Sequence, residues 1–551
     1  MIITGSAISN SWSSGVYVYS WSTPSIHFND IYTNSNDYYG LKSDTSGFDA
    51  TNNWWGGIGG PKPYGTGNGV YRAAADPWSD VPFTQAGVEA QAMGTDTWCG
   101  AFGEPVNTST GAFYYSHTDI NIPTRGLPLV FARTYNSNDG NNGPLGYGWS
   151  FNWQMSANPR SNGDVVILRG DGRRDTFTIN QDGSYNPPAG RHDNLIKNAD
   201  GTYRLSTQEQ TTYNFGANNR LASLVSETGQ ATTFTYDGNK RLTTITEPAG
   251  RTLNLSYTPE NRINEITDPQ GNTVSFGYSP EGNLTQVIDQ NGGVTAYAYD
   301  SAHRITAVTD PNGNTFVNNT YDATGKVVEQ RDAEGNLLTF AYDPANRRTT
   351  MTRRMDPGDP SKDQVTVHQY DPQLRLAKET DPYGKETVYT YDAAGNRDSV
   401  TDRRGVTTRT IYDSYGNISD LYKAYGRPEH QHTHFTYNSK NHPLTRTDAR
   451  GYTTNYTYDA TGTYLEQIAY PQVINYDGTF SSYTEAFAYN ADGTLATSTD
   501  RNGDLTGYTY DSYGGLDSVT KNTNRQPADQ VTLNYDFDSL GRKTAMTDGN
   551  G

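Results

Sequence analysis

A tyrosine followed by Asp, Asn or another small residue recurs along this chain from residue 213 onward, most often at intervals of 21 residues. Longer intervals of 25, 28 and 31 residues have the size of single turn insertions. A short, fixed period is typical of chains that stack many copies of one small structural unit. The fifteen repeat tyrosines are Tyr213, Tyr236, Tyr257, Tyr278, Tyr299, Tyr321, Tyr342, Tyr370, Tyr391, Tyr412, Tyr437, Tyr458, Tyr489, Tyr510 and Tyr535.

Each repeat has the pattern of a β-hairpin. A second aromatic residue usually stands two positions before the tyrosine, as Phe234 does before Tyr236, so that both rings share one face of a strand. Aliphatic residues follow at six and nine positions after the tyrosine, as in Leu242 and Ile245. In a regular strand, two residues three positions apart point to opposite faces, so these two aliphatic residues would not share a face. Either a β-bulge or a strand packed on both faces would explain the spacing, and the sequence leaves both open.

The turns between strands have their own signature. An acidic residue with glycine three positions later recurs about half a period after the tyrosine, as in Asp268–Gly271 and Asp310–Gly313. Asp can bond to its own backbone in a turn, and Gly accepts a positive φ. These turns account for so many of the 60 acidic residues that no catalytic carboxylate pair stands out.

One repeat is too small to be stable alone, because a few buried side chains do not offset the entropy lost in ordering the chain. Neighbouring repeats must therefore share hydrogen bonds and packing. An open twisted sheet rarely exceeds about ten strands before it curls. Since fifteen repeats supply many more strands than that, we expect a curled sheet.

The repeats resemble the YD repeats of Rhs proteins, as in Tyr299–Ile305 followed by Asp310–Thr315. Tc toxin shells, bacterial wall-associated proteins and teneurins share these repeats. The resemblance implies that the ribbon winds into a hollow shell, which often encloses a C-terminal toxin in bacterial members and serves adhesion in teneurins. It implies an all-β fold, with a YD-repeat hairpin ribbon curling into a partial shell.

Two further segments precede the repeats. Motifs within Glu104–Gly111, Arg125–Leu129, Arg133–Ser137 and Gly143–Ser150 resemble the uncharacterised domain that leads into the repeats of bacterial Rhs proteins. Leu129, Phe131 and Arg133 alternate as in a strand, and we expect a β-rich structural collar.

Residues 1–75 repeat Ile or Val and Asn at spacings of 23–25 residues, which fits the last coils of a right-handed parallel β-helix. The segment Asn52–Gly56 resembles the close of such a helix. We expect the domains 1–75 (β-helix end), 76–94 (linker), 95–212 (pre-repeat domain) and 213–551 (repeats). Both ends of the chain have the pattern of cut domains.

Three histidines form one cluster of candidate transition-metal ligands. His430, His432 and His434 alternate and so share one face of a strand, a geometry that zinc or copper can use. Phe435 and Tyr437 occupy the other phase, which the repeat assigns to packing. We therefore favour a solvated strand over a metal site.

No other chemistry stands out, and we predict no catalytic residue, cofactor or bound metal. The single cysteine, Cys99, excludes an internal disulfide and is interpreted as a packed thiol. Calcium in the loop Asn138–Asn141 is disfavoured, because no twelve-residue loop with a closing Glu is present. Nucleophile elbow, phosphate-loop and zinc-protease motifs are absent from the sequence.

The net charge of −18, without a basic block, disfavours nucleic acid and anionic membranes as partners. No apolar run is long enough to span a membrane, and no signal peptide is visible. We predict a non-enzymatic scaffold of a secreted or surface Rhs-type protein, with the export signal and a C-terminal toxin or other cargo outside this chain. The alternatives are a glycan-binding adhesin and a polysaccharide lyase or hydrolase with its active site in upstream coils.

Overall fold

The computed structural model describes residues 99–548 except Pro357, together with the backbone of nine short strands within residues 2–74. The described residues are almost entirely β. Their helices are three single turns of 3-10 helix, η1 (Pro344–Asn346), η2 (Pro360–Lys362) and η3 (Pro527–Asp529). None of the described helices has the length and apolar character needed to cross a membrane.

The N-terminal strands pair in parallel. The partners lie 23 to 25 residues apart in the pairs Ile2↔Ser25, Val16↔Leu41 and Phe48↔Ala73, as expected for coils of a parallel β-helix. The handedness, the segment Asn52–Gly56 and the linker 76–94 lie outside the described residues. The strands are β1 (Ile2–Thr4), β2 (Ala7–Ile8), β3 (Val16–Val18), β4 (Ser25–His27), β5 (Asp30–Ile31), β6 (Tyr39–Ser43), β7 (Phe48–Asp49), β8 (Gly69–Tyr71) and β9 (Ala73–Ala74).

The collar precedes the repeats and consists of small antiparallel sheets. The largest are β12–β13–β16 and β17–β18–β19–β20. Leu129, Phe131 and Arg133 are all buried along β13, which confirms the predicted strand. The strands are β10 (Ala101–Phe102), β11 (Val106–Asn107), β12 (Tyr114–Ile122), β13 (Leu129–Asn136), β14 (Asn142–Gly143), β15 (Gly146–Tyr147), β16 (Trp149–Phe151), β17 (Ser156–Pro159), β18 (Val165–Leu168), β19 (Arg174–Ile179) and β20 (Tyr185–Asn186).

The repeats form one 32-stranded antiparallel sheet in which each strand pairs with its neighbours in chain order. The small hairpin β47–β48 is inserted between β46 and β49. The strands from β21 to β37 are β21 (Asn194–Lys197), β22 (Tyr203–Ser206), β23 (Thr212–Phe215), β24 (Leu221–Val225), β25 (Ala231–Tyr236), β26 (Leu242–Thr246), β27 (Thr252–Tyr257), β28 (Ile263–Thr267), β29 (Thr273–Tyr278), β30 (Leu284–Ile288), β31 (Val294–Tyr299), β32 (Ile305–Thr309), β33 (Thr315–Tyr321), β34 (Val327–Arg331), β35 (Leu337–Asp343), β36 (Arg348–Arg353) and β37 (Gln364–Tyr370).

The sheet continues in the same order to the end of the described chain. Its remaining strands and the inserted hairpin are β38 (Leu376–Thr380), β39 (Glu386–Tyr391), β40 (Arg397–Thr401), β41 (Thr407–Tyr412), β42 (Ile418–Lys423), β43 (Gln431–Tyr437), β44 (Pro443–Thr447), β45 (Thr453–Tyr458), β46 (Leu465–Ala469), β47 (Val473–Ile474), β48 (Phe480–Ser481), β49 (Thr484–Tyr489), β50 (Leu495–Thr499), β51 (Leu505–Tyr510), β52 (Leu516–Lys521), β53 (Val531–Phe537) and β54 (Lys543–Thr547).

A β-bulge explains the aliphatic spacing of three. In the hairpin β25–β26, Thr235 pairs with Thr244 and Tyr236 pairs with Leu242, so that Thr243 is an extra residue. Leu242 and Ile245 are therefore both buried on one face of the sheet. Most of the other repeat hairpins show the same shift, so the bulge is the correct one of the two explanations.

The repeat tyrosine ties each repeat to the one before it. The hydroxyl of Tyr257 donates to the carbonyl of Leu242 at 2.7 Å, and Tyr278 donates to Ile263 at the same distance. The acceptor is the residue that starts the second strand of the preceding repeat. Tyr236, Tyr299, Tyr321, Tyr342, Tyr391, Tyr412, Tyr437 and Tyr489 make equivalent bonds.

The aspartate that follows the repeat tyrosine closes the next turn. Asp237 Oδ1 accepts hydrogen bonds from the backbone N–H groups of Asn239 and Arg241, both at 2.9 Å. The Arg241 side chain also donates to Asp237 Oδ2 and lies over the ring of Tyr257, 4.8 Å from its centre. In the second kind of turn, Gly271 takes a positive φ of 86°. The turn residues thus also connect consecutive repeats.

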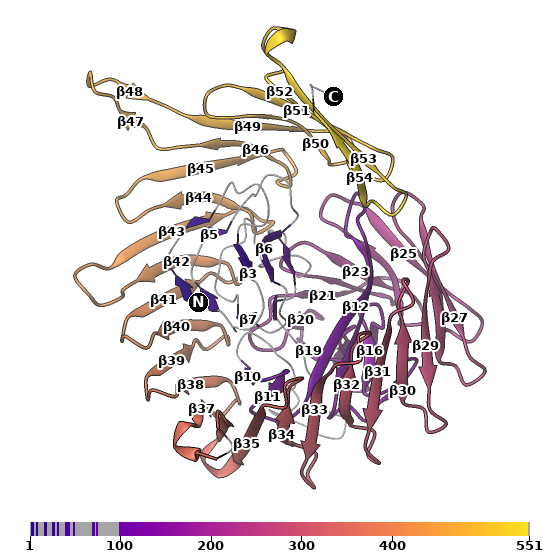
Figure 1. Cartoon of the computed structure of the whole chain (residues 1–551). Coiled ribbons are helices and arrows are strands. Elements are labelled where there is room, and N and C mark those ends of the chain that lie inside the picture. The colour runs from indigo at the N-terminus through magenta and orange to yellow at the C-terminus, as the bar shows by residue number, and fades with distance from the viewer. Residues whose placement is uncertain are drawn as a thin grey trace.

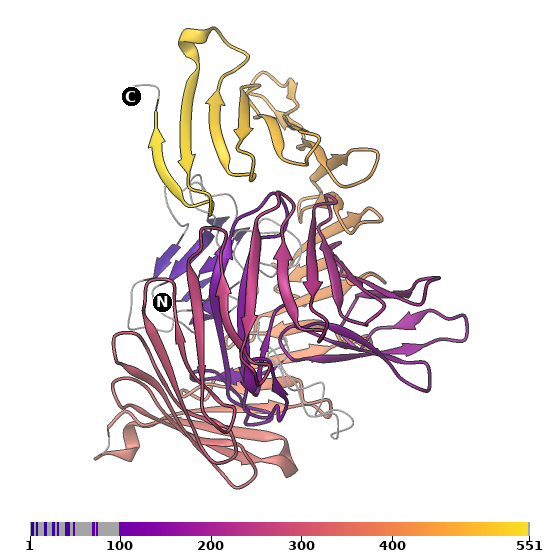
Figure 2. The same ribbon diagram turned by 90° about the vertical axis from the view of Figure 1, so that its right-hand side faces the viewer.

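The sheet curls into a wall that surrounds the collar. Figure 1 shows β27–β33 on one side, β37–β46 rising along the other side, and β49–β54 crossing back above the first strands. Figure 2 shows these C-terminal strands above the strands at the start of the sheet. The collar strands β12 and β16 lie on the concave side (Figure 1). The prediction of a curled ribbon is confirmed.

Candidate functional site

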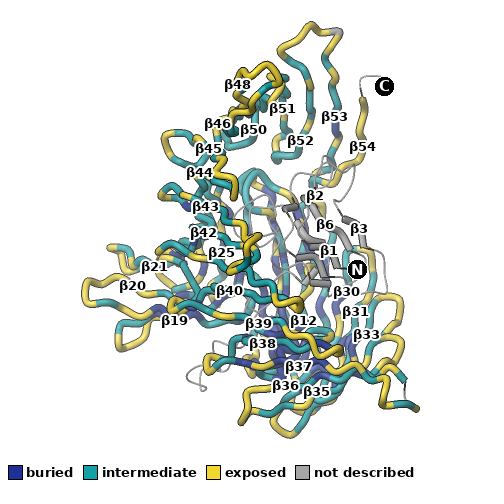
Figure 3. The backbone as a smooth tube through the Cα atoms, turned by 90° about the vertical axis from the view of Figure 1, so that its left-hand side faces the viewer, coloured by how far each residue is buried: buried dark blue, intermediate teal, exposed yellow. Residues whose placement is uncertain are grey.

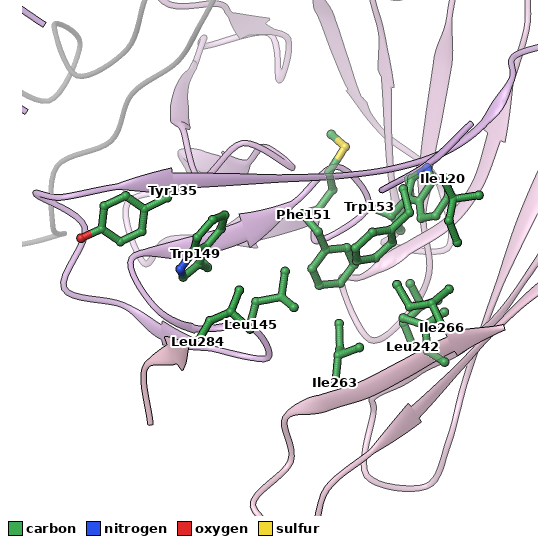
Figure 4. Close-up of a cluster of buried hydrophobic side chains, with 14 of the residues drawn as sticks. Ile120, Tyr135, Leu145, Trp149, Phe151, Trp153, Leu242, Ile263, Ile266 and Leu284 are labelled. Atoms are coloured by element: carbon green, nitrogen blue, oxygen red, sulfur yellow. The ribbon is translucent and has the colours of Figure 1, made fainter. Parts of the chain in front are cut away.

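The concave face of the wall packs on aromatic residues of the collar. Trp153 contacts Phe234 with ring centres 5.9 Å apart, and Trp149 meets Tyr297 edge to face at 5.2 Å. Figure 4 shows Trp149, Phe151 and Trp153 of the collar facing aliphatic side chains of the wall such as Ile263. The residue two positions before the repeat tyrosine therefore points into the shell.

A buried ion pair lies within this interface. Arg133 donates to Asp119 Oδ2 at 2.8 Å and to the hydroxyl of Tyr297 at 2.7 Å. Its guanidinium lies 5.0 Å from the ring centre of Trp149, and the side chains of Arg133 and Asp119 are 0% and 2% exposed. Burial raises the pKa of Tyr297 above its ordinary value, so its hydroxyl keeps its proton. The pair joins collar strands β12 and β13 to wall strand β31.

The collar packs against only part of the concave face of the wall. Inward residues of the first repeats, such as Ile245 and Val308, are fully buried, whereas the equivalent Val400 and Val519 are only partly buried. Figure 3 shows the buried residues gathered around the collar and the strands it touches, while β40–β54 are intermediate or exposed except for Tyr535 on β53. The later strands thus present a concave face that the collar does not fill.

Turns from distant repeats meet along one line, which we call the seam. Gly190 donates to the carbonyl of Ala394 at 2.7 Å, and Gln208 donates to Asn417 at 2.9 Å. Further along, Gln270 donates to Ser539 at 2.8 Å. These partners are 204 to 269 residues apart in the chain. The seam therefore joins the second turn of the ribbon to the first.

The collar also reaches the seam. Arg125 donates to the carbonyl of Ser512 at 2.7 Å. Arg251 donates to the carbonyl of Ser539 at 2.9 Å and lies over the ring of Tyr513, 4.5 Å from its centre. These two arginines connect the collar and the first turn of the ribbon with its last strands.

A histidine–glutamate pair lies at the seam. His442 Nε2 lies 3.1 Å from Glu227 Oε2, and His442 Nδ1 lies 2.8 Å from the carbonyl of Gly462. Burial alone would lower the pKa of His442, but the hydrogen bond and charge of Glu227, together with the Gly462 carbonyl, raise it above its usual value. A raised histidine pKa gives a stabilisation that is complete below about pH 6.5 and is lost as the pH rises through the raised pKa.

We therefore expect His442→Gln to lower the melting temperature more at about pH 6 than at about pH 9. The loss in unfolding free energy should not exceed about 1 kcal/mol, because solvent screens a partly exposed pair. Differential scanning calorimetry across this range measures it, with His430→Gln as the control. A difference that does not vary with pH would show that the pair carries no charge-dependent stabilisation.

The structure gathers two of the three candidate metal ligands. His432 and His434 lie on β43, and both contact Asp420 on β42, whereas His430 precedes β43 and its ring contacts the carbonyl of Arg427. Burial alone would raise the pKa of Asp420, but the hydrogen bonds from His434 and His432 outweigh it and lower the pKa. The histidine alternation did not indicate Asp420, since this residue lies on the neighbouring strand.

The other candidate sites, the loop Asn138–Asn141 and Cys99, lie within the folded collar. Asp139 of the loop Asn138–Asn141 accepts the backbone N–H of Asn141 at 3.0 Å and lies 3.6 Å from Arg174. Asp139 thus takes part in the hydrogen bonding of its own turn. Cys99 is half-buried at the start of the collar. The buried pair of Arg133 and Asp119 was missed, and its only sequence signal was an arginine in the apolar phase of a strand.

The described residues define a repeat protein whose hairpins form a curved β-shell around a collar domain. Family profiles match in the same order along the chain: a domain of unknown function (DUF6531) at residues 103–177, the Teneurin YD-shell at 194–376 and the RHS repeat at 370–398. Residues 194–398 thus carry repeats of the Rhs/YD type, as the sequence predicted. The chain is a structural shell protein.

Similar proteins match over limited parts of the chain. The tRNA nuclease WapA of Bacillus subtilis (strain 168) is 30% identical over 168 residues, which are 30% of this chain and 7% of that protein. The probable deoxyribonuclease RhsB of Dickeya dadantii (strain 3937) is 39% identical over 82 residues, 14% of this chain and 6% of that protein. The chain thus spans a small part of these relatives.

Solved structures that align with this chain include complexes of Tc toxins, with low TM-scores of no more than 0.41. The crystal structure of TcdB2–TccC3 aligns with a TM-score of 0.41 and 15% identity, covering 80% of this chain and 24% of that chain. The Photorhabdus luminescens Tc holotoxin pore aligns with a TM-score of 0.39 and 10% identity, covering 76% of this chain and 30% of that chain.

Proposed function

We propose that this chain is the non-catalytic wall of a container that holds a C-terminal toxin or other cargo. The observation that supports this function is the uneven inner face. The collar buries the inward apolar residues of the first repeats, whereas the inward residues of β39–β54, apart from the buried Tyr535, stay at least partly exposed. A cargo that is unfolded or partly apolar would cover that surface and be kept from water and proteases.

The proposed order of domains along the chain is consistent with a cargo that follows the wall. We propose a β-helix end at 1–75, a linker at 76–94, a collar at 95–212 and the repeat wall at 213–551, with the cargo encoded after the wall. The continuous sheet already includes the hairpin β21–β22, so the collar and the wall share residues 194–206. The protein would act outside the cell or on its surface. Because two relatives are named nucleases, a nuclease is the cargo class to test first.

The test is protease protection of the segment that the same reading frame encodes after Gly551. The full protein and that segment expressed alone are digested with trypsin in parallel, and the survival of the segment is followed by mass spectrometry. Containment predicts that the segment survives within the full protein and is degraded alone. Equal rates of digestion would contradict it.

A variant that lacks one contact of the seam provides a second test of containment. Arg251→Gln removes the guanidinium that connects the first turn of the ribbon to the carbonyl of Ser539. We expect the downstream segment to become sensitive to trypsin in this variant while circular dichroism still shows an intact sheet. Continued protection with an intact sheet would mean that the seam does not close the container.

Adhesion to glycans is the second candidate function, favoured by tyrosines at turn tips. Tyr383 is 85% exposed and Tyr415 is 68% exposed, and exposed aromatic rings can stack on sugars. Binding of the full chain to a glycan array, lost in Tyr383→Ala, would support adhesion. A lyase or hydrolase with its site in upstream coils would involve residues outside those described, and nothing in the described wall favours it.

A further inference from the structure

The outer face of the wall carries two neighbouring histidines in one of the lengthened repeats. Phe435 stands two positions before Tyr437, as Phe234 stands before Tyr236, and Phe234 contacts the collar. His434 alternates with Phe435 along β43 and so points away from the interior. Its side chain is 46% exposed, and that of His432 is 40% exposed. Both rings are therefore accessible from outside the shell.

Asp420 brings a carboxylate to these rings. Its backbone pairs directly with His434 across β42 and β43, and His432 lies two residues further along the strand. Asp420 Oδ1 lies 2.8 Å from His432 Nε2 and 2.8 Å from His434 Nδ1. The three ligand atoms lie within 4.8 Å of one another. Two imidazole nitrogens and one carboxylate oxygen thus face a common point.

The two nitrogen–oxygen separations are close to those of a coordination site. Zinc binds histidine nitrogen and carboxylate oxygen at about 2.0–2.2 Å, which places neighbouring ligand atoms of a tetrahedral site roughly 3.3–3.5 Å apart. The nitrogen–oxygen distances need to widen by only a fraction of an ångström. Exposed side chains can rotate by that amount without moving the strands.

Neighbouring groups hold the ligands in position. Ser419 Oγ donates to Asp420 Oδ2 at 2.8 Å, which leaves Oδ1 directed at the two rings. The ring of Tyr422 stacks on His432 with centres 4.3 Å apart and an angle of 6°. Contacts of this kind to the outer atoms of ligands orient them and tune the affinity of metal sites.

We propose that Asp420, His432 and His434 form a site for a divalent transition metal ion, with zinc as its natural occupant. Imidazole with one carboxylate suits zinc and its neighbours in the first transition series rather than calcium or magnesium. On binding, each ring coordinates the ion through the nitrogen that faces Asp420, any proton on that nitrogen moves to the other ring nitrogen or to solvent, and water completes the coordination. The ion would fasten β42 to β43 below the long turn 424–430. This site is independent of the container function, because it lies on the opposite face of the wall.

Isothermal titration of the full chain with zinc chloride tests the proposal. We expect one zinc ion per chain, and we expect Asp420→Asn and His434→Gln each to weaken binding by at least about 100-fold, more than is typical for the loss of an outer contact. His430→Gln is the matched control, because His430 lies in the same histidine run but outside the three-residue group. Its affinity should equal that of the unchanged protein.

Titration with cobalt provides a readout that does not depend on stability. Cobalt in a site with nitrogen and oxygen ligands gives visible absorption bands, which should appear in the unchanged protein and in His430→Gln and be absent from Asp420→Asn. Circular dichroism of each variant confirms that the sheet is intact. Absence of saturable zinc binding, or an equal loss in His430→Gln, would overturn the proposal and leave the group as a hydrogen-bonded cluster only.

Discussion

Arg133→Met is expected to lower the free energy of unfolding by about 3–5 kcal/mol, as for the breaking of a buried ion pair. The substitution leaves Asp119 as a buried carboxylate at 2% exposure without its cation. It also removes the donor to the Tyr297 hydroxyl and the cation over Trp149. Urea denaturation followed by tryptophan fluorescence measures the loss, since Trp149 adjoins the altered residue.

A double substitution separates the pair from its surroundings. Asp119→Asn together with Arg133→Met removes both charges, so it should cost less than the sum of the two single changes. Arg404→Met is the control, because Arg404 is 77% exposed and such surface pairs contribute at most about 1 kcal/mol. Additive losses in the double variant would contradict a direct interaction between Arg133 and Asp119.

Trp149→Ala is expected to destabilise the protein by about 3–5 kcal/mol, because it opens a cavity between collar and wall. Trp149 is fully buried, packs against Tyr297 and donates from Nε1 to the hydroxyl of Tyr299 at 2.9 Å. Trp149→Phe keeps an apolar ring and loses the N–H donor, so its cost should be smaller. Hydrogen exchange resolved by mass spectrometry should show faster exchange in β31 as well as in the collar.

A control variant separates the stability loss caused by a cavity between collar and wall from the loss caused by removing any large aromatic side chain. Tyr383→Ala removes a large ring that is 85% exposed and should change stability by less than about 0.5 kcal/mol. If Trp149→Ala accelerated exchange in the collar alone, with β31 unchanged, the collar would not be packed on the wall as described.

The hairpins and their curl were predictable from the sequence because both depend on local, repeated signals. The aromatic residue before Tyr236 and the aspartate after it recur in most repeats, so the strand and the turn are each indicated many times. The bulge at Thr243 was left open, because the sequence spacing fits two geometries and only the pairing of Thr235 with Thr244 distinguishes them.

Contacts between distant repeats could not be predicted. The seam joins residues such as Gln270 and Ser539, which are common turn residues and carry no signal of a partner 269 positions away. The complete set of ligands in the proposed metal site could not be predicted for the same reason. Alternation placed His432 and His434 on one face, but Asp420 reaches them through strand pairing, and His430 lies beyond the strand in a turn.

The distance between Gln270 and Ser539 tests the closed wall most directly. Spin labels at these two positions, in a Cys99→Ser background, allow electron–electron double resonance to measure it. Because their side chains are 2.8 Å apart across the seam, the account predicts a single short distance. In an open ribbon the same turns would be separated by 23 strand spacings, or about 110 Å at ~4.8 Å each. A long or broad distribution in the folded protein would contradict a ribbon that winds back onto its own first turn.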